Sequence, residues 1–79
     1  MNYWLEELAL VESAAVRIRN LEVVAGQRFD QALVHAAAKA APGERAMPSL
    51  ELSDWLAARR DTDAAWGRWA EVMKARPRP

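Results

Sequence analysis

His35 is the only histidine in the chain, which makes it the first residue to consider for catalysis or metal binding. A zinc site needs further ligands at suitable spacing, and a general base needs a nucleophile beside it. His35 has neither, although Asp30 and Lys39 lie within two helical turns of it. The chain has no cysteine, which excludes a thiolate metal site and a disulfide framework. We therefore expect no metal, no cofactor and a structural or solvent-facing histidine.

The remaining polar residues show no arrangement typical of an enzyme. None of the serines lies in a G-x-S-x-G motif, and there is no glycine-rich phosphate loop. The acidic pair Glu6-Glu7 suits a helix N-terminus, and Asp61 and Asp63 suit a solvated face or a cap. The sequence therefore predicts no catalytic residues and no enzymatic activity.

Basic residues gather late in the chain, among the tryptophans. Nucleic-acid binding would need them on one face, beside rings on which bases can stack. Asp61, Asp63 and Glu71 dilute this cluster, and the net charge of the chain is zero. We expect nucleic acid not to be the main partner, and keep a small helical nucleic-acid-binding regulator as the alternative function. The candidate contacts for an anionic partner are Arg60, Arg68, Lys74, Arg76 and Arg78.

Helical periodicity is the strongest pattern in the sequence. Apolar residues recur at alternating spacings of four and three, which is typical of an amphipathic helix. This pattern predicts one long helix from about residue 2 to about residue 40. Its seam comprises Trp4, Leu8, Val11, Ala15, Ile18, Glu22, Ala25, Phe29, Ala32 and Ala36.

Gly26 lies inside this predicted helix, where glycine costs about 1 kcal/mol relative to alanine. The seam keeps its phase across Gly26, which favours a continuous helix. The alternative is a break near Gly26, which would let the first helix fold over into a monomeric three-helix bundle.

The segment "APGERAMPS" must end the first helix, because proline cannot continue it and glycine suits a turn. We take residues 42–48 as the connector and residues 76–79 as a flexible, basic, proline-rich tail of a single domain, 1–79. A second helix is predicted from about residue 53 to about residue 75, capped by Ser49 or Ser53. Its seam comprises Leu52, Trp55, Arg59, Thr62, Trp66, Trp69 and Met73.

The sequence thus predicts an all-α fold, a helical hairpin in which large residues of the second helix pack against small residues of the first. A short connector would place residue 55 beside residue 37, and residue 66 beside residue 26. Gly26 would then allow close approach of Trp66 or Trp69. The expected hairpin core comprises Ala25, Gly26, Phe29, Trp55, Trp66, Trp69 and Met73.

In that register the second helix is too short to cover the first, and the N-terminal part of the first helix would project as an overhang. An exposed apolar stripe marks an interface. We expect two copies to associate through it as a homodimer with a four-helix arrangement. The expected partner or dimer interface comprises Tyr3, Trp4, Leu5, Leu8, Val11 and Ala15.

These features favour a small non-catalytic protein-protein interaction module. It would act on another protein as an inhibitor, adaptor or chaperone-like accessory subunit, and its size would suit the product of a mobile element. No apolar run approaches the roughly 20 residues that span a bilayer, and no signal peptide is visible. We therefore expect a cytoplasmic protein with no membrane partner.

Overall fold

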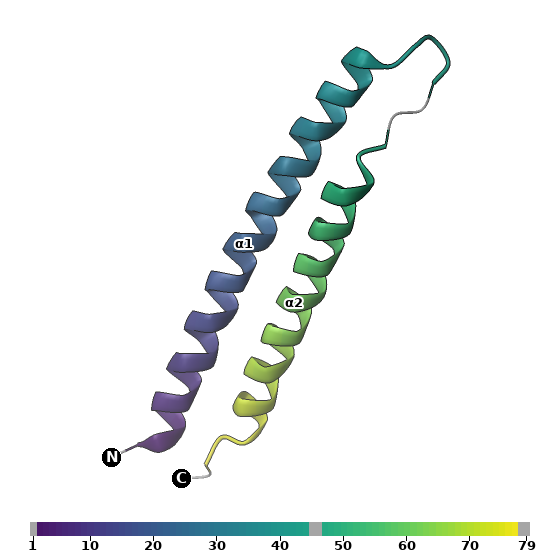
Figure 1. The fold of residues 1–79 in the computed structure, drawn as a ribbon. Coiled ribbons are helices and arrows are strands. Elements are labelled where there is room, and N and C mark those ends of the chain that lie inside the picture. Colours follow the sequence, from purple (N-terminus) through teal and green to yellow (C-terminus); the bar gives the residue numbers. More distant parts are fainter. Residues whose placement is uncertain (1, 45–46, 78–79) are drawn as a thin grey trace.

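Two antiparallel helices form the fold, α1 (Tyr3–Lys39) and α2 (Ser49–Lys74) (Figure 1). The computed structural model describes residues 2–44 and 47–77. Within these ranges there is no strand, and the helices pack along each other. The predicted all-α helical hairpin is confirmed.

Helix α1 begins and ends within one residue of its predicted bounds. The side chain of Asn2 caps its start by accepting a hydrogen bond from the backbone N–H of Leu5, at 3.3 Å. Glu6 in the first turn and Lys39 in the last turn complement the helix dipole. The helix runs unbroken through Gly26, so the alternative with a break at this glycine, and with it the three-helix bundle, is wrong.

Helix α2 begins four residues earlier than predicted. Pro48 stands at its N-cap without a side-chain cap, and Ser49 instead donates to the carbonyl oxygen of Met47 at 3.4 Å. The expected capping by Ser49 or Ser53 is therefore wrong. Proline suits this position because it has no N–H that would need an acceptor. Thr62 lies inside the continuous helix, where its hydroxyl donates to the carbonyl oxygen of Ala58 at 3.1 Å.

The chain between the helices turns at Gly43, whose φ of 82° is the left-handed conformation that favours glycine. Ala41 and Glu44 close this turn with two hydrogen bonds. The N–H of Ala41 donates to Oε2 of Glu44, and the N–H of Glu44 donates to the carbonyl oxygen of Ala41, both at 2.9 Å. The predicted connector 42–48 falls between the helices, although residues 45–46 lie outside the described residues.

The register of the hairpin differs from the predicted one by about three helical turns. The ring of Trp55 lies against Gly26, where a Cβ atom would be 3.1 Å from the indole Nε1. Trp55 also stacks on Phe29, with 5.5 Å between ring centroids. The predicted pairs, residue 55 with 37 and residue 66 with 26, are therefore wrong. The prediction assumed a tight turn, whereas the observed connector runs back alongside the last turns of α1 (Figure 1).

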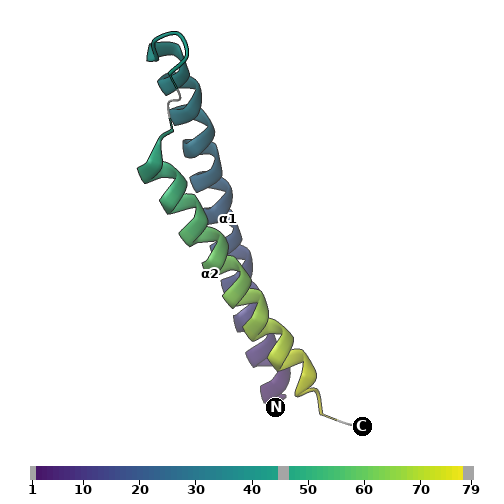
Figure 2. The same ribbon diagram turned by 90° about the vertical axis from the view of Figure 1, so that its right-hand side faces the viewer.

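This register removes the expected N-terminal overhang. The start of α1 lies beside the end of α2 (Figure 1), and the indole of Trp4 donates to the carbonyl oxygen of Val72 at 2.7 Å. The part of α1 that α2 leaves uncovered is its C-terminal end, next to the connector (Figures 1 and 2).

The predicted seams face the other helix almost throughout. All ten seam residues of α1 are half-buried or buried, and so are six of the seven seam residues of α2. The exception is Arg59, which is exposed and holds its guanidinium 5.6 Å from the ring centroid of Trp55. Seen from the side, the two helices cross at an oblique angle (Figure 2).

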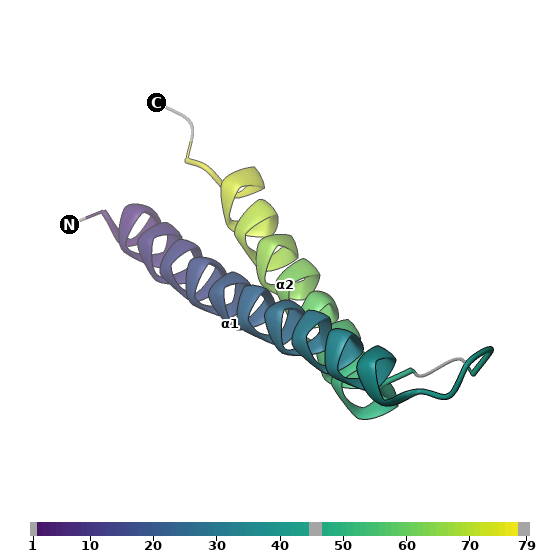
Figure 3. The same cartoon turned by 90° about the horizontal axis from the view of Figure 1, so that it is seen from above.

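The molecule is long and thin, with extents of 65 × 15 × 15 Å (Figure 3). Its radius of gyration is 18.5 Å, whereas a compact chain of this length would have about 11.6 Å. Of the described residues only Ala15, Ala65 and Thr62 are buried, and none is large. Two helices alone therefore enclose almost no core.

The two helical glycines give a matched test of the register. At Gly67 an added Cβ meets nothing within 4 Å, so Gly67→Ala should stabilise the hairpin by about 0.5–1 kcal/mol through helix propensity. At Gly26 the side chain would meet Trp55, so Gly26→Leu should destabilise it by about 1–3 kcal/mol through overpacking. Chemical unfolding at one fixed protein concentration measures both. A Gly26→Leu variant as stable as Gly67→Ala would contradict the observed register.

Candidate interaction surface

The residues first considered for chemistry lie apart from one another on the surface. His35 is exposed and lines a shallow hollow of α1 with Asp30, Gln31, Val34 and Ala38. Within residues 2–44 and 47–77, no three His, Cys, Asp or Glu side chains gather closely enough to hold a metal ion. The arrangement around His35 thus offers neither a ligand set nor a nucleophile.

The expected hairpin core lies along the contact between the helices. Phe29 and Trp55 form one stacked aromatic pair. A second pair is formed by Trp66 and Trp69, whose rings meet edge to face with centroids 5.6 Å apart. Such aromatic pairs add to the energy of the buried area itself. Every member of the set is half-buried, namely Ala25, Gly26, Phe29, Trp55, Trp66, Trp69 and Met73.

Trp4 ties the N-terminal end of α1 to the C-terminal end of α2. Its acceptor, the carbonyl oxygen of Val72 in the last turn of α2, also accepts a hydrogen bond from the backbone N–H of Ala75 at 3.2 Å, so the indole uses its second lone pair. Arg76 places its guanidinium 5.9 Å from the centroid of the Trp4 ring. Trp4 is therefore a contact within the hairpin and is not presented freely to a partner.

The expected partner interface is divided by the fold. Tyr3 and Leu5 are exposed. Trp4, Leu8 and Val11 are half-buried and Ala15 is fully buried, all on the seam toward α2. The sequence argument misplaced these four because it assumed an overhang.

The candidate contacts for an anionic partner do not form one patch. Lys74 pairs with Glu71 at 3.6 Å, and Arg76 lies against Trp4. Arg60 lines a hollow on one side of α2, while Arg68 lines the gap toward α1. Arg78 lies outside the described residues.

Two rows of exposed apolar side chains run along α1, and of their members only Tyr3 and Leu5 were expected from the sequence to form an interface. One row contains Tyr3, Leu10 and Leu21, and the last two are 71% and 64% exposed. The other row contains Leu5, Val16, Val23 and Val34. The spacings within each row are seven and eleven, close to two and three whole turns, so each row keeps one direction along the helix. These spacings of seven and eleven were the available signal in the sequence.

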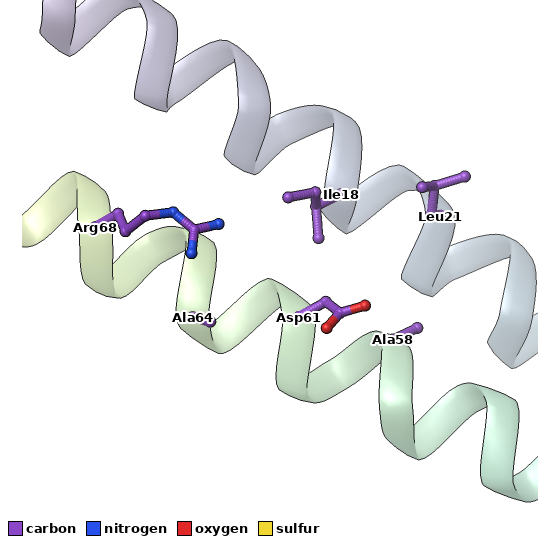
Figure 4. A pocket seen from close by; sticks show the side chains of 6 residues that line it. All are labelled: Ile18, Leu21, Ala58, Asp61, Ala64 and Arg68. Carbon is purple, nitrogen blue, oxygen red and sulfur yellow. The ribbon is translucent and has the colours of Figure 1, made fainter.

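A groove runs along one side of the hairpin. Two neighbouring hollows lie in it, both lined by α1 and α2, and both include Ala64 and Arg68. In the first, Asp61 and Arg68 of α2 project toward the gap beside Ile18 and Leu21 of α1 (Figure 4). We call this side the grooved face; its lining residues are Glu7, Val11, Ile18, Leu21, Ala58, Asp61, Ala64, Gly67, Arg68, Glu71 and Val72.

The grooved face is hollow because α2 contributes small residues to it. Ala58, Ala64 and Gly67 line it, whereas the indoles of α2 lie on the contact seam. Within the described part of the chain, neither Asp61 nor Arg68 takes part in an ion pair. The surface therefore combines an apolar rim, an accessible helix and two unpaired charges, which suits docking of another helix.

Comparisons of the chain with protein-family models, with curated proteins and with solved structures find no match. Neither α1 nor α2 contains a stretch that is long and apolar enough to cross a lipid bilayer.

Trp4 and Trp69 allow a matched test of how much the hydrogen bond between Trp4 and Val72 stabilises the hairpin. The indole N–H of Trp69 is buried and has no acceptor among the described residues, so Trp69→Phe removes an unsatisfied donor along with some volume. We expect it to change the free energy of unfolding by less than about 1 kcal/mol. Trp4→Phe removes the bond to Val72 and should cost about 1–2 kcal/mol. Equal losses in chemical unfolding would show that the Trp4 hydrogen bond contributes nothing.

Proposed function

We propose that this chain is a non-catalytic protein-protein interaction module that completes its core only with another polypeptide. The observation that carries this proposal is the amount of surface that the hairpin leaves in water. Its accessible surface is 6427 Å². A compact monomer of 8.9 kDa would expose about 4,800 Å².

The excess of about 1,600 Å² is large compared with what association requires. A stable interface of standard size buries about 800 Å² on each partner. The exposed area also includes both apolar rows of α1, which form stripes of the kind that mark interaction sites. Self-association into a four-helix homodimer is the most economical way to cover one of them.

The two exposed apolar rows lie on opposite flanks of α1, which suits a module that binds two other polypeptides at once. If a second copy covers one flank, the other remains available for a different protein. The chain would then act on that protein as an inhibitor, adaptor or chaperone-like accessory subunit. A chain without cysteine is compatible with a reducing compartment, so the proposal includes a cytoplasmic location.

Self-association makes thermal stability depend on protein concentration, because only the folded chain associates. We expect the Tm to rise by about 3–6 °C for each tenfold increase in concentration. Circular dichroism between micromolar and hundred-micromolar chain measures this shift, and sedimentation equilibrium gives the mass. A stable monomer whose Tm is independent of concentration would refute the need for another polypeptide.

The basic residues provide a test of the alternative regulator. Since Arg60 and Arg68 line different hollows and the net charge is zero, we expect no tight binding to random duplex or single-stranded nucleic acid at physiological salt. Fluorescence anisotropy with labelled oligonucleotides measures the affinity. Tight binding that weakens steeply with salt would favour the nucleic-acid-binding regulator.

A further inference from the structure

The apolar rim of the grooved face belongs to α1. Leu21 lines the first hollow, and Tyr3 and Leu10 lie on the same side of the helix as Leu21. Leu21 stands beside Ala58 and Ala64 of α2. A rim of large residues next to a floor of small ones is the shape into which a second helix pair can pack.

We propose that the grooved face docks a second copy of this chain about a two-fold axis that crosses the helices. In this dimer α2 packs antiparallel on α2 of the other copy, with the axis between Ala64 and Ala65, and α1 packs antiparallel on the other α1. The proposal rests on the self-association proposed above and specifies the surface that produces it.

Charge placement on α2 supports this axis. Asp61 and Arg68 lie seven residues apart, two helical turns, and the midpoint between them falls between Ala64 and Ala65. Both side chains line the first hollow (Figure 4). An antiparallel copy therefore places Asp61 of each chain opposite Arg68 of the other, whereas a parallel copy would place like charges opposite each other.

The residues of α1 on the grooved side also match an antiparallel two-fold pairing of two copies. An antiparallel pairing that places Glu7 opposite Arg28 also places Leu21 opposite Ala14, and Leu10 opposite Ala25. All six positions lie within about 40° of Leu21 on the helical projection. Opposite charges and large-to-small contacts thus occur together in a single register.

One axis serves both helices. The midpoint on α1 lies beside Ile18, and the midpoint on α2 lies beside Ala64. Ile18 and Ala64 line the same hollow, so the two midpoints are at the same level of the hairpin. A different protein would not require this two-fold pattern, whereas an isologous dimer requires it.

Charge reversal tests the surface. Asp61→Arg and Arg68→Asp should each weaken the dimer at least about tenfold, because each places two pairs of like charges in contact. The combined variant restores both pairs in reversed order, and its dissociation constant should return to within about threefold of the original. Sedimentation equilibrium measures the constants, and circular dichroism confirms that each variant stays helical.

Matched controls come from the same helix. Arg59 and Asp63 line a hollow with Leu56 on another side of α2, so Arg59→Asp and Asp63→Arg should leave the dissociation constant unchanged. A dimer that tolerates Asp61→Arg and Arg68→Asp, or that the combined variant fails to restore, overturns this surface but leaves self-association intact. A monomeric wild-type chain overturns the proposed self-association itself.

A cysteine introduced at the axis gives a second, independent readout, because the chain has no cysteine of its own. Position 64 of each copy lies against position 64 or 65 of the other, within the range that a disulfide can bridge. Ala64→Cys treated with oxidised glutathione should form a covalent dimer. Ser53→Cys, about three helical turns from the axis, should not, because the two copies of position 53 would lie about 35 Å apart. Cross-linking at position 53 in preference to position 64 would place the interface elsewhere.

Discussion

The contact between Trp55 and Gly26 decides how the two helices are placed. An indole is the largest side chain that a helix can present, and Gly26 is the one position in α1 where the backbone itself can receive it. Phe29, one turn further along, offers its ring for stacking. With Trp55 seated there, the end of α2 reaches the start of α1, where Trp4 meets Val72. The connector then has to run back along α1 to reach the start of α2.

A hairpin built in this way has a single seam and no enclosed interior. Each helix gives one side to the other, and every other side remains in water. Small side chains dominate the closest contacts, so Ala15 and Ala65 are buried while the large residues remain half-exposed. Because burial of apolar area is the main source of folding free energy, such a chain is close to the lower limit of stability by itself. Under the proposed self-association, the contact between copies would supply the missing burial.

The proposed function therefore rests on the exposed surfaces of the hairpin. The groove exists because the tryptophans of α2 fill the seam and leave alanines and a glycine to line the adjacent side. The apolar rows on α1 flank that seam on both sides. If the chain acts as proposed, it recognises its partner through the shape and charge of a helix pair, and folding and association are thermodynamically linked.

The sequence by itself determined the helices, because the spacing of three and four along each seam persists through Gly26 and Thr62 and is a local property of the chain. It also determined which residues face the seam. It did not determine the register, because small residues recur along α1 and several alignments place large opposite small. Only the tertiary structure selected Gly26 as the site for Trp55, through a close contact that periodicity does not encode. That selection removed the N-terminal overhang and left the apolar rows and the grooved face as the exposed surfaces.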